Sequence, residues 1–479
     1  MTGINVTAID LGTTTIAMSS YNMSDISSIC HSYNDDNKNT TAAFMNPLIP
    51  YGADVISRMG SAMNGKGEEM KRILWEFIAE RTDRSARHVL IGGNTAMIHI
   101  LMGYDPASLT RAPFIPDVRP PQPFESEYIP GATIHIVPWA SAFIGGDIIA
   151  GLYAIDRLIE ENLSIDPDSE NFDNMNKGSR TSANRLFIDL GTNGEMVLMK
   201  TSNKSGINDE TLTDGLLNNN ANRHTEFYAT ATAAGPAFEG GGLSCGVPGI
   251  PGAISHVRLY PVRHKLTTID NLYPIGLCGS GAVSIAAELY RKGYVNKDAS
   301  LTDKFPSDGI FLCDTQNTIS GFNASDTSDT NCVQGSKNER AIIFTADDLH
   351  EILLAKAAIA AGIKTLLKAA QLQPSDIDVL YLAGGFGYHI SPDDCEILGM
   401  FPGIPAEKII PAGNTCLQGL DILSDRCTEN CTHNSLASLP QEADLYKSND
   451  IMFPVPDMHI INLGNSDYFK KEYLMNVSF

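Results

Sequence analysis

Two short stretches carry the residue types best suited to chemistry. Asp10-Leu11-Gly12-Thr13 recurs as Asp189-Leu190-Gly191-Thr192. Each follows one apolar run and precedes another, which predicts a strand, a tight glycine turn and a second strand. Glycine permits the turn and a close approach of the backbone, while threonine hydroxyls and main-chain N–H groups form a hollow for anions. Two such hairpins, each led by an aspartate, predict a site for a nucleotide's phosphates and magnesium.

The residues expected to bind phosphate are Gly12, Thr13, Thr14 and Thr15 in the first hairpin and Gly191, Thr192, Asn193 and Gly194 in the second. Asp10 and Asp189 are the expected magnesium ligands, through water. Asp189, or failing that Glu195, is expected to orient the attacking water, because phosphoryl transfer depends mostly on positioning and charge stabilisation. A single copy would read equally well as an ordinary hairpin with an aspartate capping its turn. The duplication favours a phosphotransferase or ATPase.

Composition narrows the possible partners. The 479 residues include 34 basic and 56 acidic ones, a formal net charge of −22, which argues against general binding to nucleic acid or to an anionic membrane. No apolar segment reaches the roughly 20 residues needed to span a bilayer, and no signal core is evident, so a cytoplasmic protein is expected. The nine cysteines are scattered and odd in number, which favours reduced thiols. Cys427 and Cys431 read as part of a polar tail rather than as metal ligands.

The hydrophobic pattern alternates between strands and helices and predicts two duplicated α/β lobes. The first lobe spans 1–160, and a polar linker or insertion follows at 161–184. The second lobe spans 185–424, with polar insertions at 200–225 and 314–340. A C-terminal extension, 425–479, is expected to pack back on the lobes.

Two further features belong to this pattern. A strand ends in a glycine pair in each lobe, at Gly92-Gly93 and Gly384-Gly385. In the second lobe, Thr345 and Asp348 form a capping box ahead of a helix over 349–372, whose alanine-rich face and Gly362 predict close packing against a sheet. Lys356 on this helix could approach the nucleotide or could equally be a solvated charge.

A Walker A loop is rejected. Residues 60–66 spell G-x-x-x-x-G-K, but Gly67 follows where a Ser or Thr is needed, and the segment comes after a helix rather than a strand.

The chain resembles the ASKHA superfamily, the bilobal actin-like, ribonuclease H-like ATPase fold of sugar kinases, heat-shock-70 chaperones and actin. More narrowly, it resembles the ASKHA domain of the ATP-dependent reductive activators of corrinoid proteins. The stretches that carry this resemblance are 10–15, 51–58, 93–97, 189–195, 232–240, 278–281, 355–359 and 382–387. The resemblance implies a nucleotide cleft between the lobes. It also implies that Gly279 and Ser280 contact the nucleotide and that Gly384, Gly385 and Gly387 form the adenosine loop.

By this resemblance, the expected function is ATP-driven activation of a corrinoid protein by reduction of Co(II) to Co(I). The implied cofactors are ATP and Mg²⁺, and the implied partners are the corrinoid protein and a second subunit in a homodimer. Such activators usually carry an iron–sulfur module, but no cysteine run of that kind occurs here, so the electron is expected from a separate donor. Three alternatives stay open: a small-molecule kinase, an activator of another low-potential enzyme, and a non-catalytic ATP-binding scaffold.

Overall fold

The computed structural model describes residues 5–22, 40–52, 54–164, 183–203, 223–314, 341–384, 390–429 and 455–479. By contacts the chain divides into two compact units. The first comprises Met1–Ala183, Met199–Ala229 and Asn414–Ile460, and the second comprises Asn184–Leu198, Thr230–Gly413 and Ile461–Phe479. This division differs from the predicted lobe boundaries, which placed all of 185–424 in the second lobe.

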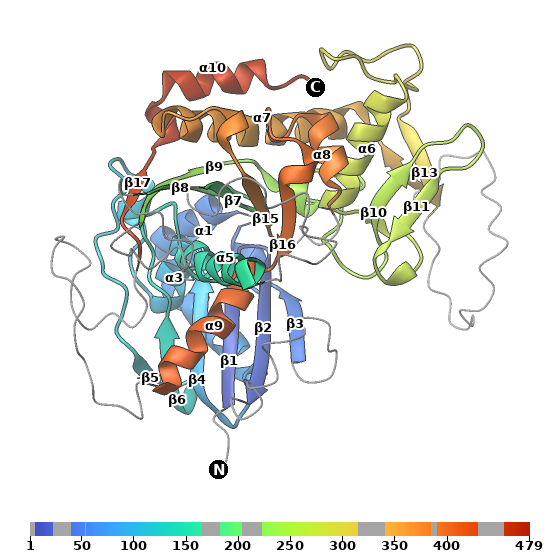
Figure 1. The fold of residues 1–479 in the computed structure, drawn as a ribbon. Helices are drawn as coiled ribbons and strands as arrows, with labels where there is room; N and C mark the ends of the chain where they lie inside the picture. The colour runs from blue at the N-terminus through green and yellow to red at the C-terminus, as the bar shows by residue number, and fades with distance from the viewer. Residues whose placement is uncertain are drawn as a thin grey trace. The chain divides into compact units, whose positions relative to one another are not determined.

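The first sheet is centred on the first Asp-Leu-Gly-Thr hairpin (Figure 1). Its strand order is β3-β2-β1-β4-β6-β5. β1 pairs with β2 in antiparallel register and with β4 in parallel register, and β6 runs parallel to β4. These strands are β1 (Asn5–Leu11), β2 (Thr15–Asn22), β3 (Thr40–Met45), β4 (Ala86–Gly93), β5 (Phe124–Ser126) and β6 (Ile129–Ile136). The predicted strand–turn–strand at Asp10 is confirmed.

The second sheet repeats this plan around the second hairpin. Its strand order is β16-β15-β7-β8-β9-β17, in which β15 runs parallel to both β7 and β16. The strands are β7 (Asn184–Leu190), β8 (Gly194–Asn203), β9 (Arg223–Thr232), β15 (Val379–Ala383), β16 (Ile409–Gly413) and β17 (Met458–Ile460). The series β3-β2-β1-β4-β6 therefore corresponds to β9-β8-β7-β15-β16, so the duplication predicted from two four-residue stretches is confirmed at the level of topology.

In the first unit, helices cover the first sheet. They are α1 (Val55–Ser61), α2 (Gly67–Arg81), α3 (Thr95–Met102), α4 (Ala107–Thr110), α5 (Gly146–Ser164) and α9 (Thr415–Glu429). Apolar side chains of β1, β4 and β6 form one buried core with α2 and α3, which includes Ile9, Leu74 and Ile91. α9 packs on α5, β1 and β4, which is why the chain from Asn414 groups with this unit. The G-x-x-x-x-G-K stretch lies within helical segments, as its rejection requires.

The second unit contains the long helix of the predicted capping box, α7 (Ala346–Ala369). The box is present: the Thr345 side chain accepts from the Asp348 N–H, and the Asp348 carboxylate accepts from the Thr345 N–H. A Cβ at Gly362 would lie 2.9 Å from Met196 Cε on β8, so the predicted close packing of this helix on a sheet is confirmed. α10 (Asp467–Met475) lies along α7 (Figure 1).

Smaller elements complete this unit. α6 (Gly279–Arg291) and α8 (Pro392–Leu398) pack against each other. A three-stranded sheet, ordered β11-β10-β12, comprises β10 (Ala253–Arg258), β11 (Lys265–Thr268) and β12 (Gly276–Leu277). β13 (Ile310–Asp314) and β14 (Ala341–Phe344) form a two-stranded antiparallel sheet.

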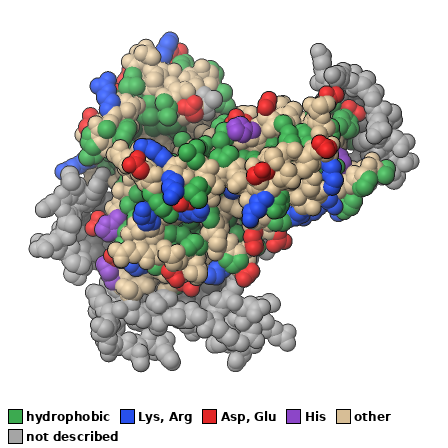
Figure 2. Space-filling view, turned by 90° about the horizontal axis from the view of Figure 1, so that it is seen from above, with side chains coloured by type: hydrophobic (Ala, Val, Ile, Leu, Met, Phe, Trp, Pro, Cys, Tyr) green, Lys and Arg blue, Asp and Glu red, His purple; other side chains and the backbone are tan. Residues whose placement is uncertain are grey.

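On the face shown in Figure 2, hydrophobic, basic and acidic side chains are interspersed. Among the residues the structure describes, no helix has the length and apolar character required to traverse a lipid bilayer.

Candidate functional site

The first phosphate loop, Gly12 to Thr15, is a tight turn held by a buried asparagine. A Cβ at Gly12 would lie 2.5 Å from the Thr15 carbonyl oxygen, so the turn requires glycine. Asn46 Nδ2 donates to the Gly12 carbonyl at 2.7 Å, and the Asn46 N–H donates to the Thr14 carbonyl at 2.9 Å. Thr13, Thr14 and Thr15 remain partly exposed. The loop is therefore fixed in shape while its hydroxyls can meet a ligand.

Asp10, at the end of β1, belongs to a pair of aspartates in the first unit. Asn414 Nδ2 donates to Asp10 Oδ2 at 2.8 Å, while the Asn414 side-chain oxygen accepts from the Leu417 N–H in α9. Burial raises the pKa of Asp10, although the hydrogen bond from Asn414 opposes that shift. Burial and the charge of Asp10 together raise the pKa of Asp147, at the start of α5, to about 7.

Two desolvated carboxylates that repel each other are stabilised by sharing a proton or a divalent cation. This pair therefore fits the magnesium ligation expected of Asp10 and adds Asp147 to it. Within the described ranges, no group of three or more His, Cys, Asp and Glu side chains is arranged to hold a metal, so any further ligands here would come from water or substrate.

The second phosphate loop, Gly191 to Gly194, is closed by its own backbone and by an acidic side chain. The Gly191 N–H donates to the Asn193 carbonyl at 2.8 Å. Thr192 Oγ1 donates a short hydrogen bond to Glu239 Oε2, at the end of the turn Pro236–Glu239. A Cβ at Gly194 would overlap with Ile359 of α7, so this glycine lets the hairpin pack under the helix.

The two predicted catalytic groups of this loop differ in exposure. Asp189 is half-buried at the end of β7, whereas Glu195 is 8% exposed on β8. Gly279 and Ser280 begin α6 and are both buried. A Cβ at Gly279 would overlap with the Phe238 carbonyl, so α6 packs directly against the turn that carries Glu239. In this structure, Gly279 therefore serves close packing behind the phosphate loop.

Gly384 ends β15 beside the second phosphate loop. Its φ of +109° lies outside the range that side chains favour, and a Cβ there would overlap with the Leu190 carbonyl at the end of β7. Its N–H donates to the Gly413 carbonyl at 3.2 Å. The other two residues predicted for the adenosine loop, Gly385 and Gly387, lie outside the described residues.

Replacing Gly384 with alanine is expected to destabilise the protein by about 1–3 kcal/mol, the range for a residue forced into a sparsely populated backbone conformation. It is also expected to weaken ATP binding, because the strain falls where β15 meets the phosphate loop. Urea unfolding and calorimetric titration with ATP measure the two effects. Gly60→Ala is the matched control, since a Cβ there meets nothing within 4 Å; equal behaviour of the two variants would contradict the role given to Gly384.

Lys356 is placed differently from both sequence interpretations. It is 2% exposed, and its Nζ donates to the carbonyls of Asn476, at 2.9 Å, and Ser478. The neighbouring Lys364 bonds Glu472 Oε2 at 2.9 Å. Lys356 is therefore neither a solvated charge nor directed at a nucleotide in this structure: it holds the segment after α10 against α7. The hydrophobic pattern placed the helix correctly but contained no sign of this contact.

Burial, aided by the charge of Lys364, lowers the pKa of Lys356 from 10.5 to about 8. Below pH 8 the folded and unfolded chains both hold this proton, whereas between about 8 and 10.5 only the unfolded chain does, so raising the pH favours folding. Lys356→Met is expected to remove this contribution to the pH dependence of the free energy of unfolding. Urea unfolding from pH 7 to 10.5 measures it, with the exposed Lys470→Met as control. An unchanged pH dependence in Lys356→Met would refute the assignment.

Three site residues were missed by sequence reasoning: Asn414, Asp147 and Glu239. Each had a signal. Gly413-Asn414-Thr415 repeats the Gly93-Asn94-Thr95 sequence that begins α3, and Asn94 caps that helix through its side chain. Asp147 follows the pair Gly145-Gly146 at a helix start. Glu239 lies in the stretch 232–240, which the family resemblance already includes.

Comparison with known proteins bears on the same regions. A model of the RACo middle region matches residues 6–157, and a model of the C-terminal domain of RACo, the ASKHA domain, matches residues 220–448. The corrinoid activation enzyme RamQ of Eubacterium limosum is 27% identical over 481 residues, which cover 92% of this chain and 69% of that protein. The [Co(II) methylated amine-specific corrinoid protein] reductase of Methanosarcina barkeri is 24% identical over 316 residues, covering 61% of this chain and 45% of that protein.

A solved structure, a reductive activator for a corrinoid, iron–sulfur protein, superposes on the chain with a TM-score of 0.69 at 23% identity. The match covers 100% of this chain and 66% of the activator, so the chain spans about two thirds of that protein's length. This likeness confirms the predicted α/β ASKHA fold. Since the two matched regions together take in most of the sequence, the chain belongs to the RACo family of ASKHA-domain proteins.

Proposed function

We propose that this protein uses ATP to drive the reductive activation of a corrinoid protein, in which one electron from a separate donor converts Co(II) to Co(I). The observation that carries the proposal is the duplicated Asp-Leu-Gly-Thr hairpin, placed at the same position in two sheets of identical order, in a chain of the RACo family. Two relatives have names that describe activation or reduction of corrinoid proteins.

In this proposal one phosphate loop in each unit binds the phosphates of ATP. Gly12 and Thr13 to Thr15 donate from the first loop, and Thr192 to Gly194 from the second. Asp10 and Asp147 would hold Mg²⁺ in the first unit, and Asp189 in the second. When bound, the ion would neutralise charge on the phosphates, which the protein's net charge of −22 otherwise repels.

Glu239 has a positioning role in the same proposal. By accepting the Thr192 hydroxyl proton, its carboxylate fixes the direction of that hydroxyl's lone pairs. Asp189 accepts a hydrogen bond from the attacking water and so orients it towards the terminal phosphate. The products of that step are ADP and inorganic phosphate, and the change of nucleotide state would alter the shape the protein presents to its partner.

ATP is required on thermodynamic grounds, because reduction of Co(II) to Co(I) is uphill for common biological donors. The free energy of hydrolysis can be coupled to a conformation of the corrinoid protein in which the reduction is easier. The four-coordinate cobalt chemistry belongs to the partner, and the electron comes from a donor that this chain does not have to contain.

The test measures two signals in one anaerobic reaction containing the protein, a purified Co(II) corrinoid protein and a low-potential chemical reductant. ATP hydrolysis is followed by phosphate release, and Co(I) formation by the visible spectrum of the corrinoid. The expected result is that hydrolysis rises when the corrinoid protein is added and that Co(I) accumulates only with ATP and Mg²⁺. Co(I) formation at the same rate without ATP, or a phosphorylated small molecule as the product, would overturn the proposal.

A further inference from the structure

We propose that the turns at one end of the β11-β10-β12 sheet form a docking surface for the corrinoid protein, which would insert a bulky apolar side chain there and present acidic side chains around it. The identity of the partner rests on the proposed function. The surface itself is argued from four features of the second unit: exposed apolar side chains, a rigid turn, an adjoining cavity and an uneven charge distribution.

Four large apolar side chains project from neighbouring turns. The exposed fractions are 40% for Ile250, 54% for Leu272, 57% for Tyr273 and 43% for Ile275. Hydrogen bonds keep these turns together: the Ile275 N–H donates to the Gly252 carbonyl at 3.1 Å, and the Gly252 N–H donates to the Ile269 carbonyl at 2.9 Å. Single exposed apolar residues are ordinary, but a contiguous group of this kind marks an interaction site. We call these four residues the apolar patch.

The backbone under the apolar patch is held in an unfavourable conformation. Asp270 and Asn271 have φ values of 57° and 53°, in the left-handed region that residues other than glycine rarely adopt. Gly252 has φ +88°, and a Cβ there would lie 2.7 Å from the Tyr273 carbonyl. This turn holds Leu272 and Tyr273 outward, where they gain nothing from the protein's own core. Such strain is retained where a fixed presentation is useful.

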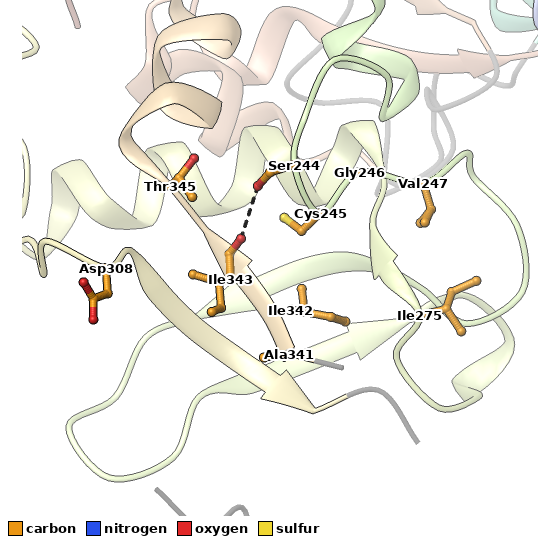
Figure 3. A pocket seen from close by; sticks show the side chains of 10 residues that line it. All are labelled: Ser244, Cys245, Gly246, Val247, Ile275, Asp308, Ala341, Ile342, Ile343 and Thr345. Carbon is orange, nitrogen blue, oxygen red and sulfur yellow. Dashed lines mark hydrogen bonds between the residues drawn. The ribbon is translucent and has the colours of Figure 1, made fainter. Parts of the chain in front are cut away.

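A cavity adjoins the apolar patch and shares Ile275 with it. It measures about 420 Å³ and lies between the loop of Ser244 to Val247 and the strand β14 (Figure 3). Figure 3 shows the side chains of Val247, Ile275 and Ile342 along it. This volume can hold a large aromatic or aliphatic side chain from outside.

The polar groups at the cavity do not favour a charged ligand. The Ser244 N–H and hydroxyl both donate to the Asp348 carboxylate, at 2.6 and 2.7 Å, and that carboxylate also serves the capping box of α7. Burial raises the pKa of the Cys245 thiol to about 12, so the thiol is neutral at physiological pH. A neutral apolar group is therefore the occupant that this lining suits. The patch outside the cavity favours a side chain carried by a protein over a free small molecule.

Charge near the apolar patch differs from that of the whole chain. From Gly240 to Ile269 the sequence contains no Asp or Glu, whereas the chain as a whole has a net charge of −22. Arg263 and Lys265, in and after the β10–β11 turn, are exposed. Arg258 is engaged by the Glu288 and Asp394 carboxylates. Asp270 and Asp308 are acidic residues at this end of the sheet. An acidic partner surface would thus meet Arg263 and Lys265 and be repelled by most other faces.

The experiment compares binding of a purified Co(II) corrinoid protein to the full-length protein and its variants by calorimetry. The double variant Leu272→Ser/Tyr273→Ser is expected to weaken binding by about 30-fold or more, the effect of losing a central anchor. Its matched control is Leu474→Ser/Met475→Ser on α10, where the side chains are 75% and 60% exposed, and this pair should bind as the wild type does. ATP hydrolysis without partner should be unchanged in both.

A charge variant guards against misfolding of the double variant. Lys265→Glu is expected to weaken binding several-fold and to flatten its dependence on salt, while the exposed Lys471→Glu should not. Wild-type affinity in both Leu272→Ser/Tyr273→Ser and Lys265→Glu would overturn the docking surface but leave the proposed function intact. Failure of the wild type to bind any corrinoid protein would overturn both. If the double variant instead turns a wild-type dimer into a monomer in light scattering, the occupant is a second copy, and the proposal is wrong.

Discussion

Asp189→Asn is expected to lower the rate of ATP hydrolysis by about 100- to 1,000-fold, the usual effect of removing one precisely placed electrostatic group from an active site. The carboxylate of Asp189 is half-buried at the end of β7, directly before the phosphate loop. Asparagine keeps the shape of the side chain but removes the charge that would orient water and hold magnesium. Phosphate release at saturating ATP and Mg²⁺ measures the effect.

Folding should survive this change, because asparagine can preserve hydrogen bonds that Asp189 accepts at the turn. The circular dichroism spectrum and the urea midpoint should match those of the wild type. Asp303→Asn is the matched control, an exposed aspartate of the same unit, and should hydrolyse ATP at the wild-type rate. If Asp189→Asn also retained the wild-type rate, the second loop would have no part in hydrolysis, and the scaffold alternative would gain support.

The second large effect concerns stability. Asp394→Ala is expected to reduce the free energy of unfolding by about 3 kcal/mol, at the lower end of the range for breaking a buried ion pair. Asp394 on α8 is 0% exposed, and its Oδ1 lies 2.5 Å from Arg291 Nη2 of α6 and 3.7 Å from Arg258 Nη1 of β10. Glu288 also faces both arginines, at 3.5 Å from each, so they would keep one acidic neighbour. This remaining partner is why the lower end of the range applies.

Urea unfolding, followed by tryptophan-independent probes such as far-UV circular dichroism, measures the loss. Asp394→Asn keeps the volume and removes only the charge, so it should fall between the wild type and Asp394→Ala. Asp393, the preceding residue of α8, is exposed, and Asp393→Asn should stay within about 0.5 kcal/mol of the wild type. Equal stability of Asp393→Asn and Asp394→Ala would show that the cluster does not hold α8 in place.

Much of the fold follows from patterns within ten or so consecutive residues. The two hairpins were identifiable because an apolar run, a glycine turn and a second apolar run fix a strand–turn–strand locally. The helix α7 was identifiable because Thr345 and Asp348 are spaced for a capping box and the alanines share one face. These features depend on side-chain period and turn chemistry, which a sequence displays directly.

Contacts between distant residues could not be predicted in the same way. The hydrogen bond between Asn414 and Asp10 joins residues 404 positions apart, and it forms because α9 packs against β1 and β4. The raised pKa of Asp147 depends on its burial close to Asp10. Lys356 lies on a correctly predicted helix, yet its partners are backbone carbonyls near the C-terminal end of the chain.

The sequence alone therefore determined the strands, the glycine turns and the aspartates that lead them, because these are properties of short segments. Tertiary structure decided which side chains share an environment: the partner of Asp10, the second aspartate beside it, and the burial of Lys356. The physical reason is that pKa and hydrogen bonding depend on desolvation and on neighbours, and both are set only when separate segments pack together.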